Sequence, residues 1–270
     1  MIVALIDYKA GNLTSVRKAL AALGAEILTP DSPADLDRAD AIIVPGVGHF
    51  EATAALDAGW HSAIRSRLAA GVPLLGICLG QQWLFEGSDE APDVPGLGVF
   101  PGRCVKLDPA RGLMDDRAPG ARYPVPGSLK VPHVGWNALK QTTRSSRLLA
   151  GVQDEAQAYF THSYVAPDSD ATVAITEHGV PFASVVEHGL VFGAQFHPEK
   201  SGETGLKMLR NFLEVAEEGR ARRAGPTGAT QPLPTPDLSR RSPRAKAAAR
   251  FPPGFDGRRP IDEGRSREVR

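Results

Sequence analysis

The feature that most restricts how this chain can fold is a cysteine held between two glycines at the end of an apolar run. Residues 72–85 read VPLLGICLGQQWLF. The apolar residues before Cys78 suit a strand covered on both faces, as in a parallel sheet, and a helical spacing of apolar residues begins at Leu79. The run therefore predicts a buried strand, a sharp turn at Cys78, and the first turns of a helix.

The glycines around Cys78 indicate the purpose of this turn. Gly76 and Gly80 stand two residues before and two residues after it, where a side chain would crowd a strained backbone. The arrangement is the thiol counterpart of the G-x-S-x-G nucleophile elbow. A buried structural cysteine is the alternative, because free cysteine behaves as a small hydrophobic residue. The glycine bracket favours the nucleophile.

The first hundred residues alternate between strand and helix patterns, which is typical of a parallel sheet with helices on its faces. Strands are expected at 2–7, 25–28, 41–44 and 74–78, and helices at 13–23 and 50–69. Later segments suit a mainly antiparallel layer with a hairpin at 188–189, followed by a last helix; they are 157–162, 172–176, 183–187, 190–196 and 203–216. We expect an α/β fold with an open, mainly parallel central sheet flanked by helices, and an additional antiparallel strand layer.

Charge and composition divide the chain into two parts. Residues 217–270 carry 13 Lys or Arg and 7 Asp or Glu, whereas residues 1–216 carry 18 and 24. The second part is rich in Arg, Pro and Gly and has no apolar periodicity, so it cannot bury enough surface to offset its ordering entropy. We expect one domain at 1–216 and a disordered basic tail at 217–270, a solvated extension rather than a nucleic-acid-binding arm.

The sequence indicates neither a membrane protein nor a disulfide-bonded one. No apolar run approaches the roughly 18 residues of a membrane helix, and the start lacks the basic region and cleavage site of a signal peptide. Two cysteines do not make a disulfide framework, and Cys104, which has no base beside it, is expected to be structural. We expect a soluble, cytoplasmic protein.

A cysteine nucleophile needs a base, and a third group that orients the base. Of the seven histidines, only His197 ends an apolar strand and has an acid, Glu199, two residues later. The intervening Pro198 stops ladder pairing, so both side chains can project from the same side of an extended turn. A capping histidine beside a surface salt bridge is the alternative, which the presence of Cys78 makes less attractive.

An oxyanion formed at Cys78 needs backbone N–H donors. Leu79 supplies one at the start of the helix. The glycine-rich loop 45–48 follows a strand and, by the rule that ligands bind at the carboxyl ends of parallel strands, lies on the same rim as Cys78 and Asp7-Tyr8. A second donor is therefore expected from Gly46, Val47 or Gly48, although such a loop is often only a turn.

These motifs together resemble those of a known family. Residues 76–82 (GICLGQQ) with 195–199 (QFHPE) look like the class I glutamine amidotransferases, which have a flavodoxin-like fold. Further matches at 6–13, 44–48, 130–137, 159–164 and 197–202 resemble the glutamine amidotransferase subunit of imidazole glycerol phosphate synthase, an enzyme of histidine biosynthesis. The resemblance covers residues 1 to about 215. Two residues depart from the family pattern: Lys9 replaces a frequent glycine and Gln81 a usual methionine.

The resemblance implies a role for each matching residue. Cys78 would attack the side-chain amide of glutamine, His197 would protonate the departing ammonia, Glu199 would orient His197, and a glutamyl thioester would be hydrolysed to glutamate. Leu79 and Val47 are assigned as the oxyanion donors. The contacts to glutamine are assigned to Gly46, Gly48, Gln82, His162, Ser163 and Tyr164. No cofactor and no metal are implied.

The implied partner is a (β/α)₈-barrel cyclase subunit that receives the ammonia in a heterodimer. In most class I relatives a glycine stands where this chain has Val47. Because a β-branched residue resists a positive φ, we expect the loop to rest with its amide misdirected until the partner binds. The alternatives are a glutaminase subunit of pyridoxal phosphate or anthranilate synthesis, and a catalytically silent α/β interaction module.

Overall fold

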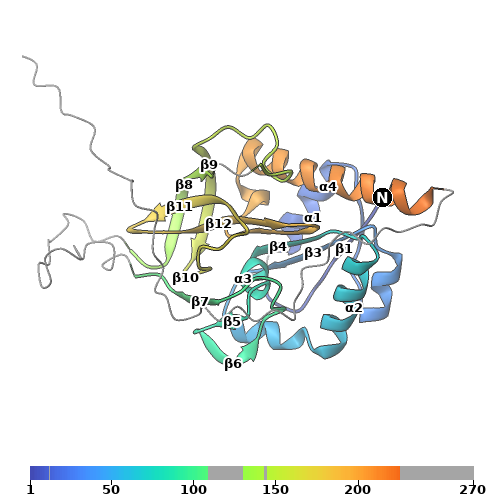
Figure 1. The fold of residues 1–270 in the computed structure, drawn as a ribbon, viewed down its shortest axis with the longest axis horizontal. Helices are drawn as coiled ribbons and strands as arrows, with labels where there is room; N and C mark the ends of the chain where they lie inside the picture. The colour runs from blue at the N-terminus through green and yellow to red at the C-terminus, as the bar shows by residue number, and fades with distance from the viewer. Residues whose placement is uncertain (12, 109–129, 143–144, 226–270) are drawn as a thin grey trace, which may run out of the picture.

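A computed structural model describes residues 1–11, 13–108, 130–142 and 145–225, and a nine-stranded sheet runs through it (Figure 1). In spatial order the strands are β2 (Glu26–Leu28), β1 (Ile2–Leu5), β3 (Ala41–Gly46), β4 (Leu74–Cys78), β13 (Val191–Ala194), β12 (Val180–His188), β11 (Thr172–His178), β8 (His133–Gln141) and β9 (Ala156–His162). Neighbours from β2 to β13 are parallel, and those from β13 to β9 are antiparallel. The antiparallel strands expected late in the chain therefore extend the central sheet itself.

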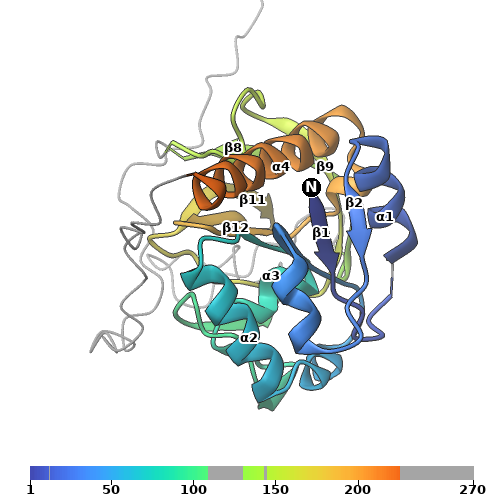
Figure 2. The ribbon, with the colours of Figure 1, turned by 90° about the vertical axis from the view of Figure 1, so that its right-hand side faces the viewer.

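Helices cover both faces of the parallel half of the sheet (Figure 2). On β4, Leu75 packs into one apolar core with α1 (Leu13–Ala22) and α4 (Gly202–Ala224). The next residue back, Leu74, packs into a second core with α2 (Ala58–Ala69) and the 3₁₀ helix η1 (Pro33–Arg38). Successive residues of a strand point to opposite faces, so the uninterrupted apolar run before Cys78 is explained by burial on both sides.

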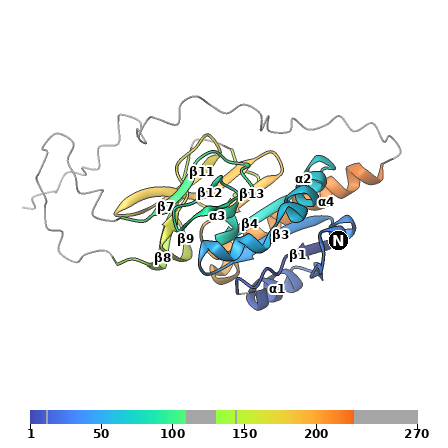
Figure 3. The same ribbon diagram turned by 90° about the horizontal axis from the view of Figure 1, so that it is seen from below.

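A second sheet has four short strands, which are labelled in Figure 1. It consists of β10 (Tyr164–Val165), β7 (Arg103–Lys106), β5 (Gly87–Ser88) and β6 (Ala91–Pro95). In Figure 3 its strand β7 lies at the same end of the molecule as β8, β9, β11 and β12. Only its central β5–β7 pair is parallel. The predicted fold class, a helix-flanked sheet with an additional antiparallel layer, is confirmed. Strand β10 begins two residues after β9 ends, so the chain at Ser163 passes from one sheet to the other.

The prediction of one helix at 50–69 is wrong in one respect, because this range contains two helices. A 3₁₀ helix, η2 (Phe50–Ala55), is followed by α2, which begins at Ala58. Asp57 separates them, and its side chain accepts hydrogen bonds from the backbone N–H groups of Gly59 and Trp60. An aspartate that caps a helix in this way starts a new one rather than continuing the old.

The last helix is longer than expected, which corrects the predicted start of the tail. Helix α4 continues to Ala224 instead of ending near Ala216, so residues 217–224 are helical. Arg223 anchors this extension: its guanidinium donates to the carbonyl of Gly71 at 2.6 Å and lies 3.6 Å from the Asp40 carboxylate. The rest of the predicted tail, 226–270, lies outside the described residues. Among the described helices, none is long and apolar enough to cross a membrane.

Candidate active site

The turn at Cys78 joins β4 directly to the short helix α3 (Leu79–Trp83). Cys78 has φ 54° and ψ −105°, a strained conformation for a residue other than glycine. A Cβ added at Gly76 would lie 2.5 Å from the carbonyl oxygen of Gly80, and one added at Gly80 would overlap the carbonyl oxygen of Val44. The backbone is thus too close at both positions for any side chain, which explains the glycine bracket.

His197 and Glu199 form a buried pair beside this turn. His197 follows β13, the parallel neighbour of β4, and Glu199 lies in the one-turn 3₁₀ helix η4 (Pro198–Lys200). The Nδ1 atom of His197 is 2.8 Å from Oε1 of Glu199, and both side chains are almost fully inaccessible to solvent. The backbone of His197 is itself held, because its N–H donates to Tyr159 and its carbonyl accepts from the Ser201 hydroxyl.

The charge state of His197 follows from three competing effects. Burial lowers its pKa, but hydrogen-bonding and Coulombic interactions with Cys78 and Glu199 outweigh burial and raise it to about 9. Nδ1 is engaged by Glu199, so the interaction with Cys78 falls to Nε2. The ring is therefore an imidazolium at neutral pH, with the proton at Nε2 on the side of Cys78.

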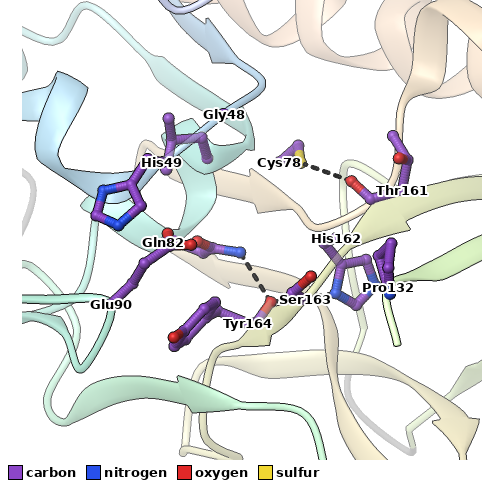
Figure 4. Close-up of a pocket in the computed structure, with 11 residues that line it drawn as sticks. Gly48, His49, Cys78, Gln82, Glu90, Pro132, Thr161, His162, Ser163 and Tyr164 are labelled. Atoms are coloured by element: carbon purple, nitrogen blue, oxygen red, sulfur yellow. Dashed lines mark hydrogen bonds between the residues drawn. The ribbon is translucent and has the colours of Figure 1, made fainter. Parts of the chain in front are cut away.

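A pocket of about 390 Å³ opens over Cys78 (Figure 4). Its walls are formed by Gly48, His49, Cys78, Leu79, Gln82, Glu90, Pro132, Thr161, His162, Ser163 and Tyr164. Five of the six residues assigned to glutamine contacts are among them. The sixth, Gly46, instead lies beneath the site: a Cβ there would overlap the Tyr8 hydroxyl and lie 3.2 Å from the Leu79 side chain. Burial raises the pKa of Tyr8, and Cys78 adds to the effect.

Two side-chain amides are held in series beside the sulfur. Gln82 Nε2 donates to the carbonyl of Tyr164 at 2.8 Å (Figure 4) and to Oε1 of Gln195 at 3.2 Å. Gln195 Nε2 in turn lies 3.8 Å from the Cys78 sulfur. The sulfur also lies 3.8 Å from the Thr161 carbonyl. Both N–H groups of Gln82 are thus taken by the protein, which leaves its oxygen as the atom able to meet a ligand.

The His162 side chain belongs to a chain of hydrogen bonds between neutral rings. Its Nδ1 pairs with the Tyr164 carbonyl at 3.1 Å, and its Nε2 with Nδ1 of His133 at 3.2 Å. Burial, and then His133, lower the pKa of His162 to about 3; burial and His178 lower the pKa of His133 to about 4. Both rings are uncharged at neutral pH, so His162 fixes the Tyr164 carbonyl through a hydrogen bond and not through charge.

The two assigned oxyanion donors differ in their present state. Leu79 is the first residue of α3, and an N–H at that position has no acceptor within the helix. The N–H of Val47 instead donates to the carbonyl of Ala10 at 2.6 Å. In this structure Val47 therefore does not offer its N–H to the pocket.

The adjoining turn explains a departure noted in the sequence. Lys9 has φ 65°, and its backbone N–H donates to the Asp7 carboxylate at 2.9 Å. Glycine, which the resemblance led us to expect at this position, adopts such a φ without strain.

Several pocket residues were missed by sequence reasoning. Glu90 lines the pocket and accepts the backbone N–H of Phe50, the first residue of η2. His49, Pro132 and Thr161 of the pocket wall, and Gln195 beside the sulfur, were also given no role. Gln195 carried a signal from chain geometry, since it stands two residues before His197 and so shares its side of an extended chain. Cys104 is buried and free, as expected, and burial raises its pKa.

Comparisons with known proteins agree on one family. Residues 4–216 match the family model described as glutamine amidotransferase class-I. The chain is 45% identical to the imidazole glycerol phosphate synthase subunit HisH of Deinococcus radiodurans, over 78% of this chain and 92% of the relative. It is 47% identical to the protein of the same name from Xylella fastidiosa, over 79% and 97%. A solved glutamine amidotransferase shares the fold, with a TM-score of 0.58 and 22% identity over 80% of this chain and all of that one.

Proposed function

Because the chain belongs to the class I glutamine amidotransferase family and, within it, to the HisH subunits of imidazole glycerol phosphate synthase, we propose that Cys78, His197 and Glu199 hydrolyse glutamine. The ammonia released would pass to a (β/α)₈-barrel cyclase subunit in histidine biosynthesis. The observation that carries this proposal is a strained cysteine at the floor of a pocket, beside a buried histidine–carboxylate pair.

The chemistry runs in two halves. The Cys78 thiolate attacks the side-chain carbonyl carbon of glutamine, and the negative charge that forms on oxygen is stabilised by the N–H of Leu79. His197 gives its Nε2 proton to the departing ammonia and so becomes neutral. It then takes a proton from water, which attacks the thioester and releases glutamate. Glu199 keeps the ring in one orientation throughout.

Recognition of glutamine draws on the polar groups of the pocket wall. The substrate carries an α-ammonium and an α-carboxylate. The Glu90 carboxylate and the Gln82 oxygen are acceptors suited to the ammonium, and the Ser163 segment offers a hydroxyl and backbone groups to the carboxylate. Since Gln82 has no N–H left to donate, we assign its role to the ammonium.

The hydrogen bond from Val47 to Ala10 supports the proposal that the enzyme rests in an inactive state. Its N–H must leave Ala10 to join Leu79 as the second oxyanion donor. We propose that the cyclase partner brings about this change. A partner surface is suggested by Val134 and Trp136 on β8, each 57% exposed, which follow Pro132 of the pocket wall. The two residues are two positions apart on one strand and so share a face, and contiguous exposed apolar side chains mark interaction surfaces.

The decisive experiment combines the full chain with a barrel cyclase and its nucleotide substrate. Glutamine-dependent formation of imidazole glycerol phosphate is expected, with one glutamate per product. Cys78→Ala should abolish glutamate release, whereas Cys104→Ala, the matched change at the buried cysteine, should retain it. Release that persists in the Cys78→Ala complex would remove the proposed nucleophile. If the wild-type complex formed product from added ammonia but not from glutamine, the chain would be a catalytically silent interaction module.

The resting-state proposal has its own test. Val47→Gly lets the loop turn without β-branched strain, so glutamate release by the chain alone should rise severalfold, while release by the complex changes little. Equal rates for the wild-type chain alone and in the ligand-loaded complex would refute gating.

A reduced, free thiol nucleophile also fits a reducing compartment, which supports our proposal of a cytoplasmic enzyme.

A further inference from the structure

Gln195 occupies a position that neither the family chemistry above nor the pocket wall explains. It lies between β13 and His197, and its side chain is fully buried. In the parallel pairing of β13 with β4, Ala194 lies opposite Ile77. The residues that follow them, Gln195 and Cys78, are therefore neighbours. The parallel sheet thus delivers an amide to the nucleophile from the same segment that delivers the base.

The orientation of the Gln195 amide follows from its neighbours. The Tyr164 carbonyl can only accept, so the Gln82 atom facing it at 2.8 Å must be Nε2. The second hydrogen of that nitrogen points to Gln195 at 3.2 Å, which must present its oxygen there. The remaining end of the Gln195 amide, its Nε2, is therefore the end that faces the Cys78 sulfur at 3.8 Å.

This N–H matters most when the sulfur is charged. As a thiol, Cys78 can donate to the Thr161 carbonyl, which lies 3.8 Å away. As a thiolate it has nothing to donate, and that carbonyl offers it no hydrogen bond. Among the described residues, His197 and Gln195 are side-chain donors that lie beside the sulfur. A hydrogen bond to a charged acceptor is roughly twice as strong as one between neutral groups, so Gln195 favours the thiolate over the thiol.

We propose that Gln195 is a further catalytic residue, whose side-chain N–H stabilises the Cys78 thiolate, and that Gln82 and the Tyr164 carbonyl are the positioning groups that hold it in the donating orientation. The role in turnover rests on the proposed glutaminase function, but the contact with sulfur does not. Gln82 thereby serves two purposes, since its oxygen faces the pocket while its nitrogen holds Gln195.

The test measures thiolate reactivity without glutamine or partner, so its outcome is independent of whether the chain proves to be a glutaminase. The full chain is alkylated with iodoacetamide across a range of pH, and Cys78→Ala supplies the background from Cys104. Gln195→Met keeps the length of the side chain but removes the donor. Its alkylation profile should be displaced upward by about one pH unit, so that the rate falls by up to about tenfold on the acidic side of the profile and the wild-type rate is recovered at high pH.

Controls separate this role from packing. Gln81→Met removes another buried glutamine amide, which donates to the Ala183 carbonyl and not to sulfur, so its profile should match that of the wild type within about twofold. Gln195→Glu keeps the size and the acceptor for Gln82 but turns an oxygen toward sulfur. The fall in alkylation rate at pH 7 in Gln195→Glu should equal or exceed the fall in Gln195→Met. Gln195→Glu therefore also provides the test if Gln195→Met does not fold.

Gln82→Met tests the positioning role of Gln82. Its alkylation profile should also be displaced to higher pH, but by less than the profile of Gln195→Met. If both Gln195 variants give the wild-type alkylation profile while only their melting temperatures fall, Gln195 is a structural residue and the proposal is overturned. If Gln81→Met causes the same displacement as Gln195→Met, the effect is general to the core and the proposal is likewise overturned.

Discussion

Replacing Glu199 by glutamine tests the electrostatics of the site with almost no change of shape. In the wild type, Nδ1 of His197 donates to the Glu199 carboxylate at 2.8 Å in a fully buried setting. In the variant Glu199→Gln, the amide oxygen of the new side chain can accept the same hydrogen bond. Only the negative charge is lost, so any change in pH dependence reports the charge and not the geometry.

The expected size of the change follows from the lost charge. An opposite charge this close to a titrating group shifts its pKa by about one to three units. Losing the Glu199 charge should therefore lower the pKa of His197 by at least about one unit, which corresponds to about 1.4 kcal/mol of imidazolium stabilisation. Because the wild-type pKa of His197 is raised to about 9, the group stays protonated through neutral pH and loses its proton as pH rises through 9. In the variant this loss begins about one pH unit lower.

The assay is the pH profile of kcat/KM for glutamate release by the complex with the cyclase partner. The alkaline limb should move from near pH 9 toward about pH 8, so the deficit of Glu199→Gln at alkaline pH exceeds its deficit at pH 7 by up to about tenfold. Glu203→Gln, an exposed change in the first turn of α4, should leave the limb in place. An unmoved alkaline limb in Glu199→Gln would refute the reasoning.

Two further predictions concern the scaffold. Gly80→Ala places a methyl group on the Val44 carbonyl oxygen and should lower the free energy of unfolding by about 3 kcal/mol, measured by urea denaturation; a loss below about 1 kcal/mol would mean that the elbow can relax. Truncation after Gly225 should leave both unfolding and activity unchanged. Truncation after Ala216 should keep activity but cost about 1–3 kcal/mol, because it removes the charged hydrogen bond and ion pair of Arg223; loss of activity in the shorter deletion would assign the tail a functional role.

The sequence by itself determined the parts of the site that depend on local chain geometry. The glycine bracket predicts the elbow at Cys78 because the crowding that excludes a Cβ is created within a few residues, with one contribution from β3. The spacing of His197 and Glu199 predicts their pairing because two residues on one side of an extended turn meet whatever surrounds them. The alternation of apolar and helical segments predicts the α/β sheet for the same reason: its periodicity is local.

Only the tertiary structure decided which distant groups meet those parts. Gln195 reaches the sulfur because β13 pairs with β4 in one register, and Val47 is engaged because the turn at Ala10 lies beside it. The end of α4 at Ala224 depends on the loop at Gly71 that Arg223 contacts. These contacts join residues far apart in the chain, so strand order and register fix them, and a local pattern carries no record of either. The elbow at Cys78 and the pairing of His197 with Glu199 were therefore readable from the sequence, whereas the contact of Gln195 with the sulfur and the acceptor that holds the Val47 N–H were not.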